Sequence, residues 1–583
     1  MYVLGLSCFY HDAAACLLRD GVPVGAASEQ VFTRKKHDPD FPIHAIRWLL
    51  GEAGIGPEDI KLVAFYDKPL VKFERLLLSH IATFPKSLPQ FVRGMPGWFA
   101  TKLRLDKVLK SELGYTGPIT YSQHHLSHAA SAFYASGFEE SAVLTVDGVG
   151  EWATASWGVG KGKRIELQEE IRFPHSLGLL YSSFTFYLGF KVNSGEYKVM
   201  GLAPYGEPIY VDRIKKLIHV HDDGSFRLDM RHFTFDHGMR MYNERFEEVM
   251  GAPTRPLGDE APLEQFHKDV ARSLQEVVNE VMVALAKKVL DSTGQKKLCL
   301  AGGVALNCVA NGHILRETDV EELFVQPAAG DAGGAMGAAL WAWHDLMGKP
   351  RRWALEDAYL GPGYDDERIA ADLDRYGAVF HRLDRAELLK RTAELIDQAH
   401  VVGWYQGRLE WGPRALGHRS ILGDPRNPEM RDTINLKIKM REGFRPFAPS
   451  CLEEDAGRYF ELEGNSPYML LVAPVRDEIR NGPDAMPAIT HVDGSARVQT
   501  VRRDQDALYY DLISEFKKLT GCAAIVNTSM NVRGEPIVNT PEDAYRCFMR
   551  TGMDVLVCGS FLMMKDEQPD IALKSAAEEF GLD

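Results

Sequence analysis

Two histidines four residues apart, His124 and His128, have the types and spacing that suit a metal site. Apolar residues at 126, 129, 130 and 133 follow the i, i+3, i+4, i+7 pattern of a buried helix face, and Ser122 is a typical N-cap. Residues four apart project together, so both imidazoles are predicted on one exposed face, opposite the apolar stripe. That geometry is typical of an H-x3-H metal site; the alternative is an amphipathic helix with solvent-facing histidines.

Two aspartates that follow predicted strands are candidates to complete this site. Asp147 comes after the β run 142–146, in a Gly-rich turn, where a carboxylate suits either a metal shell or the positioning of a bound phosphate. Asp331 comes after the strand ELFVQ and before a helix of small residues. Asp331 is therefore predicted as a further metal ligand, with a helix N-cap as the alternative.

The elements that must position these residues occur twice. Residues 2–33 read as three strands, with a polar turn at His11–Asp12 and a second turn at Asp20–Gly21. Residues 142–171 repeat that order of strands and turns. A duplicated three-stranded meander with an acidic, Gly-containing turn is typical of the actin, Hsp70 and sugar-kinase superfamily; the alternative is two unrelated hairpins.

A third strand-to-helix turn lies at Gly302–Gly303, in LAGGVALNCVANG, before a helix that carries Asn307. Glycines there allow a ligand to approach the backbone, and amides at a helix N-terminus favour an anion or a polar purine edge. A single Gly-Gly turn is weak support for such a site.

The segment 406–450 reverses the charge of the chain, with nine Lys and Arg against five Asp and Glu. Its cations stand among Gly, Pro and Phe, which favours a shaped pocket for an anion over a solvated basic face. Further phosphate donors follow the strand CAAIVN. The cations that stand among Gly, Pro and Phe are Arg414, Arg419, Lys439, Arg441 and Arg445, and the later donors are Thr528, Ser529, Asn531 and Arg533.

Length and charge limit the class of protein. A chain of 583 residues exceeds a single core, so at least two domains are expected, with a boundary in the charged, Pro- and Gly-containing passage 344–364. No apolar run reaches the roughly eighteen residues of a membrane span, which predicts a cytoplasmic protein. The net charge of -14 argues against nucleic-acid binding, and eight scattered cysteines indicate reduced thiols.

Taken together, the motifs resemble those of the O-carbamoyltransferases of nodulation-factor and antibiotic biosynthesis. The similarity covers nearly the whole chain in one order, from QHHLSHA through SGEYKVMGLAPYG, GDAGGAMGAA, EWGPRALGHRSIL and KMREGFRPFAPS to VNTSMNVRGEPIV. The resemblance implies an α/β protein of two domains. Residues 1–350 would form a duplicated actin/Hsp70/sugar-kinase-type (ribonuclease H-like), metal-binding domain, and residues 351–583 a YrdC-like domain.

The resemblance also implies a reaction. The second domain would bind carbamoyl phosphate and ATP, with Mg²⁺, and make carbamoyl adenylate, from which the first domain would carbamoylate a hydroxyl of a small molecule. The family's metal is iron, Fe(II), although two imidazoles with carboxylates also suit manganese or zinc. Carbamate and its adenylate decay in water, so a sheltered passage between the two sites is expected. The acceptor and the choice between monomer and homodimer stay open.

Carried over position by position, the resemblance assigns a role to each candidate. His11 would help to deprotonate the acceptor hydroxyl, with packing as the alternative, and Asp147 would meet the metal directly or through water. Metal ligands would be His124, His128, Asp147 and Asp331; Gly148, Gly150, Gly302, Gly303 and Asn307 would line the adenylate site; and Arg414, Lys439, Arg445, Arg497, Asn527, Ser529 and Arg533 would hold carbamoyl phosphate and nucleotide phosphates.

Two other functions compete with this interpretation. A fused enzyme for threonylcarbamoylation of tRNA would use related domains, but an isoelectric point near 5.8 counts against it. A nucleotide-gated binding or chaperone module would have no need for the anion pocket of the second domain. Acceptor specificity is expected in residues 70–110 and 207–262.

Overall fold

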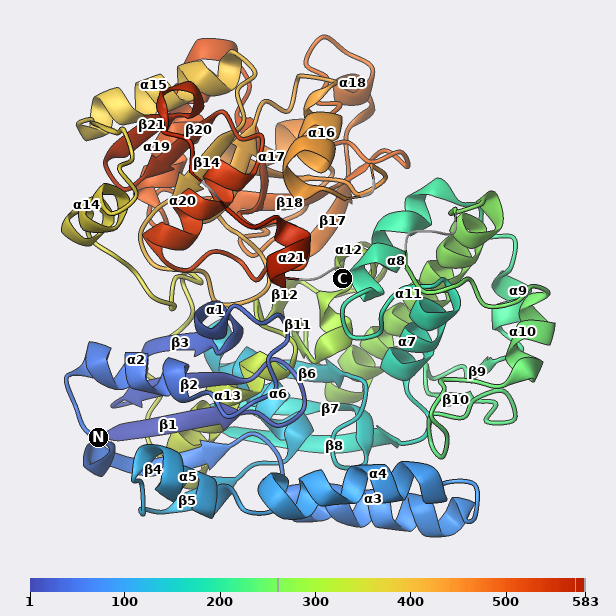
Figure 1. Ribbon diagram of the computed structural model, residues 1–583. Helices are drawn as coiled ribbons and strands as arrows, with labels where there is room; N and C mark the ends of the chain where they lie inside the picture. The colour runs from blue at the N-terminus through green and yellow to red at the C-terminus, as the bar shows by residue number, and fades with distance from the viewer. Residues whose placement is uncertain (259–261, 442, 572, 581–583) are drawn as a thin grey trace. The chain divides into compact units, whose positions relative to one another are not determined.

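The chain forms two compact units in the computed structural model, which describes residues 1–258, 262–441, 443–571 and 573–580 (Figure 1). Unit 1 comprises Met1–Glu29 and His37–Leu355, and unit 2 comprises Gln30–Lys36 and Glu356–Asp583. The sequence predicts one change of domain at 350/351, whereas the structure also assigns the short segment 30–36 to unit 2.

Unit 1 contains the same five-stranded sheet twice, and each sheet includes one of the two three-stranded meanders predicted from the repeated strand pattern. In each sheet the first three strands form an antiparallel meander, the first strand pairs in parallel with the fourth, and the fourth pairs in parallel with the fifth. The strand orders are β3-β2-β1-β4-β5 and β12-β11-β6-β7-β8. The bounds are β1 Tyr2–Ser7, β2 Ala14–Arg19, β3 Val22–Ser28, β4 Ile60–Phe65, β5 Ile119–Tyr121, β6 Glu140–Val146, β7 Ala153–Lys161, β8 Arg164–Arg172, β11 Lys297–Ala301 and β12 Glu322–Val325.

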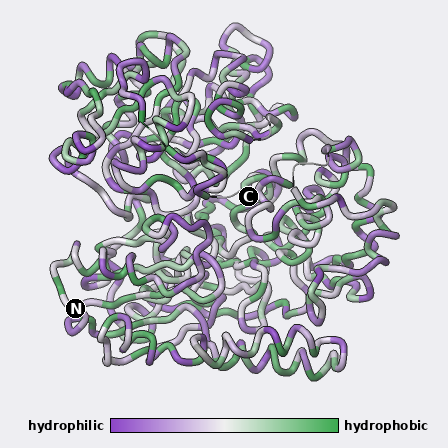
Figure 2. Tube along the Cα trace, in the orientation of Figure 1, coloured by the Kyte–Doolittle hydropathy of each residue, from purple (hydrophilic) through white to green (hydrophobic). Residues whose placement is uncertain are grey.

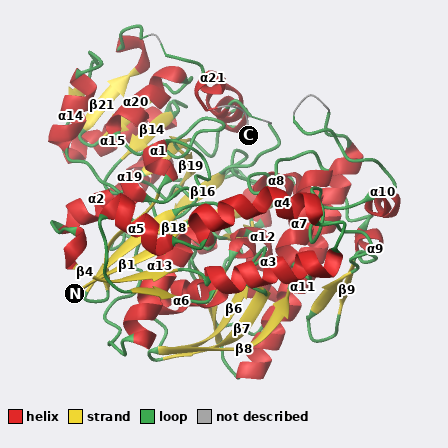
Figure 3. Ribbon diagram, turned by 60° about the horizontal axis from the view of Figure 1, so that its bottom comes forward, coloured by secondary structure: helices red, strands yellow, loops and turns green. Residues whose placement is uncertain are grey.

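Two helices fill the space between these sheets (Figure 3). Helix α13 (Asp331–Trp341) packs on β1 and β2 and against α6 (His124–Ser136), and α6 packs on β6 and β11. The helices approach so closely that a Cβ added at Gly337 would lie 1.8 Å from the carbonyl oxygen of Ser127. The small residues of α13 are therefore needed to bring Asp331 to the histidines of α6.

The predicted exposure of the histidine face is wrong. His124 is 1% exposed and His128 is fully buried, and the N-cap of α6 is Gln123, not the predicted Ser122. The reason is that α6 contacts the sheet on one side and α13 on the other, so it has no solvent face. Small residues such as Ala132 and Ser131 occur both on helices that are buried on every side and on exposed helix faces, so their types did not indicate burial.

The other elements of unit 1 cover these sheets or extend from them. The long helix α11 matches the helix predicted from about 263 to 290, and the described residues of 207–262 form only short elements. The bounds are α2 Ile43–Ala53, α3 Pro69–Thr83, α4 Leu88–Gly97, η2 Trp98–Lys102, α5 Leu105–Leu113, α7 Leu177–Tyr187, α8 Glu196–Leu202, α9 Val211–Ile214, β9 Ile218–Val220, β10 Phe226–Leu228, α10 Glu244–Met250, α11 Gln265–Thr293, η4 Gly303–Leu306 and α12 Cys308–Glu317.

Unit 2 is built on a nine-stranded mixed sheet of order β13-β21-β20-β14-β15-β19-β16-β18-β17, so an α/β second domain is confirmed. Its hydrophobic core includes the fully buried Trp404, and Figure 2 shows the hydrophobic segments of the chain in green. The strands are β13 His381–Arg382, β14 Val402–Tyr405, β15 Arg419–Gly423, β16 Ala448–Leu452, β17 Leu471–Pro474, β18 Ser495–Val501, β19 Ala524–Ser529, β20 Val555–Cys558 and β21 Phe561–Met564; the main helices are α1 Gln30–Thr33, α14 Asp366–Asp374, α15 Arg385–Asp397, α16 Met430–Thr433, η6 Ile434–Lys439, α17 Glu453–Tyr459, α19 Ala507–Thr520 and α20 Pro541–Arg550.

Arg34 anchors the segment 30–36 within unit 2. Its guanidinium donates to the carbonyl oxygens of Ile537 at 2.7 Å and Pro536 at 3.0 Å, and to the Glu535 carboxylate at 2.9 Å. Glu535 is 3% exposed and also accepts a hydrogen bond from the backbone N–H of Val532. Burial raises the pKa of Glu535, while Arg34 lowers it. The pair therefore keeps a buried carboxylate charged in the loop that follows β19.

Replacing Arg34 by alanine is expected to reduce the free energy of unfolding of unit 2 by about 3 kcal/mol, because it leaves a buried carboxylate without a counter-charge. Protonated Glu535 needs no counter-charge, and its pKa is already raised, so the loss should be largest at neutral pH and shrink as the pH falls through that pKa. Urea unfolding across this pH range measures both effects. The exposed neighbour Lys35 provides the control, Lys35→Ala; an equal loss in that variant, or a loss independent of pH, would contradict the assignment.

None of the helices in the described ranges is both long enough and apolar enough to cross a membrane.

Candidate metal centre and anion-binding face

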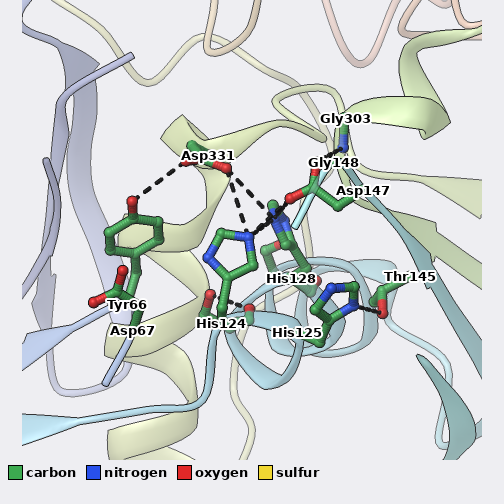
Figure 4. Close-up of polar contacts among 12 residues, drawn as sticks. Tyr66, Asp67, His124, His125, His128, Thr145, Asp147, Gly148, Gly303 and Asp331 are labelled. Atoms are coloured by element: carbon green, nitrogen blue, oxygen red, sulfur yellow. Dashed lines mark hydrogen bonds and ion pairs between the residues drawn. The ribbon is translucent and has the colours of Figure 1, made fainter. Parts of the chain in front are cut away.

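Four side chains from three segments of unit 1 converge at one point (Figure 4). His124 and His128 come from the first turns of α6, Asp147 follows β6, and Asp331 is the first residue of α13. One ligand atom from each of the four lies within 4.8 Å of all the others. The sequence therefore selected residues that the fold brings together, although 207 positions separate His124 from Asp331 along the chain.

The separations fit a shared cation. His124 Nε2 lies 3.1 Å from His128 Nε2 and 2.8 Å from Asp147 Oδ2, and Asp331 Oδ1 lies 3.7 and 3.8 Å from the two Nε2 atoms. Ligands about 2.1 Å from one metal ion lie roughly 3.0–3.4 Å from each other when the angles are octahedral or tetrahedral. Two buried imidazoles and two carboxylates at this spacing suit a divalent metal; the donor set does not choose between iron, manganese and zinc.

The charges around this point favour binding of a cation. Burial raises the pKa of Asp147, but hydrogen bonds from His124 and His128 outweigh burial and hold that pKa well below its ordinary value. Burial lowers the pKa of His124, while Asp147 and Asp331 raise it, and the carboxylates prevail. Asp147 and Asp331 thus supply negative charge in a buried place, where it is weakly screened.

Sequence reasoning missed two residues that support this group. The carboxylate of Glu151 accepts the backbone N–H of His124 at 3.0 Å and that of Lys68 at 2.8 Å, so it fixes the start of α6. The Tyr66 hydroxyl donates to Asp331 Oδ2 at 3.3 Å. The available signal for Tyr66 was its place at the carboxyl end of the parallel strand β4, where ligand-binding residues of α/β proteins gather.

His125, between the two candidate ligands, has a structural role. Its Nδ1 lies 2.8 Å from Thr145 Oγ1, and burial lowers the pKa of His125 to about 3, so its imidazole is neutral. This ring points away from the carboxylates in Figure 4. The spacing of four residues, rather than the number of histidines, indicated which rings share a site.

His11 lies beside the metal group, in the turn between β1 and β2. Its Nε2 is 3.9 Å from Asp331 Oδ2, and its Nδ1 is 3.1 Å from Asp12 Oδ2. Asp12 also meets His37 Nδ1 at 2.8 Å. Burial lowers the pKa of His11, but Asp331, Asp12 and Asp147 outweigh it and raise that pKa to about 10. His11 can therefore act as a proton acceptor only where positive charge offsets the negative charge of these carboxylates.

The predicted adenylate glycines lie around the same point. Gly303 donates its backbone N–H to Asp147 Oδ1 at 3.1 Å, which ties the two turns together. Gly302 has φ 93°, and a Cβ there would lie 2.2 Å from the Val146 carbonyl oxygen, so only glycine fits. Gly150 similarly lies against His124, whereas space beside Gly148 is open.

Asn307, the fifth predicted adenylate residue, is engaged within the protein. Its side chain caps α12 by accepting the backbone N–H of Ala310 at 3.1 Å and exchanges hydrogen bonds with Gln275. Its assignment to an adenylate site stays a prediction.

In unit 2, Lys439 occupies a cage of oxygen atoms. Its Nζ donates to the carbonyl oxygen of Ser529, to Asn531 Oδ1 at 2.8 Å and to the carbonyl oxygen of Asn531 at 3.1 Å, and Ser529 Oγ is 3.3 Å away. Lys439 is 3% exposed, and burial lowers its pKa well below the ordinary value. This lysine joins η6 to the end of β19, where the sequence predicted phosphate donors.

Other predicted anion-binding residues share this face of the sheet. Asn527 Nδ2 donates to Gln499 Oε1 at 2.9 Å and to the Ala415 carbonyl oxygen at 3.1 Å. Alternate residues of a strand share a face, so Ser529 projects with Asn527 from β19, and Arg497 projects with Gln499 from β18. Arg414 is the chain neighbour of Ala415, the backbone carbonyl of Arg445 accepts a hydrogen bond from Asn435 of η6, and Arg533 lies in the loop after β19. Asn527 is fully buried and donates only internally, so its role as a phosphate ligand has no direct support.

Arg419 does not belong to this pocket. It is fully buried in β15, and its guanidinium donates to the carbonyl oxygens of Gln406, Pro362 and Gly407. The guanidinium carbon also lies 3.7 Å from the centroid of the Tyr405 ring. Its hydrogen-bonding capacity is used to hold loops together, so the expectation of a phosphate contact is wrong.

Comparison with known proteins adds the family. A family model described as Carbamoyltransferase N-terminus matches residues 2–340, and one described as Carbamoyltransferase C-terminus matches residues 393–565.

Three relatives agree with these matches. The chain is 51% identical to an uncharacterized protein of Synechocystis sp. over the full length of both. It is 40% identical to the nodulation protein NolNO of Sinorhizobium fredii, over 96% of this chain and 79% of that protein. It is 36% identical to the 3'-hydroxymethylcephem-O-carbamoyltransferase of Streptomyces clavuligerus, over 50% of this chain and 53% of that enzyme. Since both units match their models in order, the chain belongs to the carbamoyltransferase family and is an enzyme of that class.

Proposed function

We propose that this carbamoyltransferase moves the carbamoyl group of carbamoyl phosphate, through a carbamoyl-adenylate intermediate, to a hydroxyl of a small molecule. In the first stage, water takes the phosphoryl group of carbamoyl phosphate, which gives inorganic phosphate and carbamate. An oxygen of the carbamate then attacks the α-phosphorus of ATP and releases pyrophosphate. In the second stage, the acceptor oxygen attacks the carbamoyl carbon and AMP leaves. The observation that carries the proposal is that one chain of this family combines a buried two-histidine, two-carboxylate group with a separate face rich in cations.

The first stage suits unit 2. Lys439, Arg445 and the neighbouring arginines would stabilise the phosphate that leaves carbamoyl phosphate and the charge that develops on the α-phosphate of ATP, which enters with Mg²⁺. Ser529 and Asn531, which already lie within reach of Lys439 Nζ, would orient these oxygens.

The second stage suits unit 1. We propose that His124, His128, Asp147 and Asp331 hold a divalent metal, Fe(II) in the first place, with manganese or zinc as alternatives. A divalent cation held there supplies a Lewis acid for the carbamoyl oxygen or a counter-charge for the adenylate phosphate. The amides near Gly148 and Gly303 would line the adenylate.

His11 is the proposed proton acceptor for the acceptor hydroxyl. Asp12 accepts the Nδ1–H of His11, which leaves Nε2 free to take a proton. The neighbouring carboxylates raise the pKa of His11. His11 can therefore take up this proton only when a bound cation offsets the negative charge of those carboxylates.

The name of one relative supports a natural-product acceptor. The Streptomyces clavuligerus enzyme is named for carbamoylation of a hydroxymethylcephem, and its match covers half of this chain. A small alcohol of this kind is therefore the proposed acceptor class, and transfer to threonine for tRNA modification is the alternative.

Carbamoyl-phosphate-dependent exchange of labelled pyrophosphate into ATP tests the proposal without knowledge of the acceptor. Exchange is expected with carbamoyl phosphate and not without it, because only the reversible formation of an adenylate returns the label to ATP. Absence of both exchange and pyrophosphate release from the metal-loaded protein would remove the adenylate route. Addition of threonine and tRNA, in parallel with a panel of alcohols, separates the two acceptor classes.

A further inference from the structure

A buried cluster of cations lies next to the candidate metal centre, and the mechanism proposed above does not use it. Lys72 and Arg75 project from α3 and are 3% and 5% exposed, and Lys102 ends η2 and is half-buried. The Nζ atoms of Lys72 and Lys102 lie 3.5 and 3.9 Å from the centroid of the Tyr10 ring. Tyr10 directly precedes His11, so the cluster adjoins the place proposed for the acceptor hydroxyl.

Contacts through Tyr66 and Asp67 connect the cluster to the metal centre (Figure 4). Lys72 Nζ forms an ion pair with Asp67 Oδ2 at 3.0 Å and lies 5.8 Å from the centroid of the Tyr66 ring. The Tyr66 hydroxyl in turn donates to Asp331, a candidate metal ligand. The cations therefore border the carboxylate side of the metal group within unit 1.

The charges of the cluster do not balance. Asp67 compensates Lys72, but within the described part of the chain neither Arg75 nor Lys102 has a carboxylate within ion-pair distance. The nearby carboxylate of Glu151 accepts the backbone N–H groups of Lys68 and His124 instead. Two positive charges thus remain without a partner among the described residues.

Arg75 is the strongest anomaly. Among the described residues it makes no hydrogen bond, and its Nε is completely buried. Its guanidinium carbon lies 5.0 Å from the centroid of the Phe173 ring. Buried guanidinium groups ordinarily have acceptors for their five donors, because an unpaired buried charge lowers stability. Burial lowers the pKa of Arg75 to about 10, and burial together with Lys72 lowers that of Lys102 to about 8.

Aromatic rings frame the cations. The rings of Tyr10 and Trp98 are 6.1 Å apart, and those of Phe73 and Trp98 are 5.7 Å apart. The resulting environment combines a guanidinium fork, a lysine point charge and apolar walls, which suits a charged oxyanion on an otherwise partly apolar molecule.

We propose that Arg75 and Lys102 bind an oxyanion, a phosphate or a carboxylate, beside the metal centre. The inference rests on the proposed function for its two possible sources: an acidic group of the carbamoyl acceptor, or the phosphate of the adenylate. In either case the anion supplies a counter-charge that the described residues do not place within ion-pair distance of Arg75 or Lys102. A polycationic acceptor, by contrast, would be repelled.

Acetylation of Lys102 in the wild-type protein provides the test. A lysine amine with a pKa of about 8 is more often unprotonated at neutral pH than a lysine amine with the ordinary pKa, so Lys102 should react readily; peptide mass spectrometry measures its acetylation and that of the exposed Lys110. Inorganic phosphate at ten times its Kd should slow the reaction of Lys102 about tenfold and leave Lys110 unchanged. Protection by glycerol 3-phosphate and not by AMP assigns the site to the acceptor, and the reverse assigns it to the adenylate.

Arg75→Met gives a second measurement. Removal of an unpaired buried charge should raise the thermal midpoint of the ligand-free protein, while the protection of Lys102 by phosphate is lost. The exposed Arg93 on α4 provides the matched control, Arg93→Met, which should change neither. The proposal is overturned if phosphate, glycerol 3-phosphate and AMP all leave the wild-type rate at Lys102 unchanged. Since neither measurement needs carbamoyl transfer, this failure is distinct from failure of the proposed function.

Discussion

Replacing His128 by alanine should abolish tight metal binding and with it the transfer of the carbamoyl group. His128 is fully buried, and its Nε2 lies 3.1 Å from that of His124 and 3.3 Å from Asp147 Oδ2. Loss of one of four donors from a preformed site removes both a ligand and the geometry of the others. We expect metal content, measured by elemental analysis, to fall to background, and the rate of transfer to fall about 10²–10³-fold.

The half-reaction separates this role from a general loss of structure. Pyrophosphate exchange depends on residues of unit 2 in the proposed scheme, so it should remain within about twofold of wild type. His125→Ala is the matched control, because His125 is equally buried in the same helix but bonds to Thr145. Full metal occupancy in the His128 variant would refute the ligand assignment. Equal loss of metal in the His125 variant would show that packing of α6, and not the donor atom, matters.

Replacing Lys439 by methionine should stop carbamoyl-phosphate-dependent release of pyrophosphate from ATP. The side chain is buried and aims its Nζ at Ser529 and Asn531, so its amine is fixed in place before a ligand arrives and is protonated when a phosphate binds. A fixed cation beside the reacting phosphates contributes in the transition state, and its loss should lower the rate of the half-reaction about 10²–10³-fold. Labelled pyrophosphate exchange measures this change, and the metal content should stay at the wild-type level.

Lys437→Met is the control for this variant, because Lys437 is exposed in the same η6 segment and makes no contact with the cage. Normal exchange in the Lys439 variant would remove this lysine from the mechanism. A lowered thermal midpoint in that variant, with exchange reduced only in proportion to unfolding, would instead assign Lys439 to the stability of the loop after β19.

The pKa of Lys439 adds a pH signature to the same site. Burial lowers this pKa well below its ordinary value, and a bound phosphate would raise it again. Phosphate binding then takes up a proton, so the affinity should decrease as the pH rises above the pKa of the unliganded lysine. Calorimetry in two buffers of different ionisation enthalpy detects the proton directly, and the Lys439→Met variant should show no uptake.

Local patterns in the sequence were sufficient for the elements and for the metal group. The alternation of strands and turns in 2–33 and 142–171 predicted the two meanders, because strand periodicity and turn residues act over a few positions. Spacing of four residues predicted that His124 and His128 share a side of α6, since helix geometry fixes that relation. Strand ends likewise predicted Asp147 and Ser529 near ligands.

Only tertiary packing decided the environment of these residues. When the residues of a helix are small, the local sequence pattern does not distinguish a helix packed on both sides from one with a solvent-exposed face. For this reason the exposure of His124 and His128 was predicted wrongly. Arg419 donates to loop carbonyls, and Arg34 pairs with Glu535, which is 501 residues away. Both contacts depend on neighbours that are remote in sequence. The lack of a partner for Arg75 among the described residues is also visible only in the folded structure. The sequence by itself determined which side chains can bind a metal or a phosphate, because that depends on residue type and near spacing. The tertiary structure decided which of them are buried, paired or left without a partner, because those properties arise from contacts between distant segments.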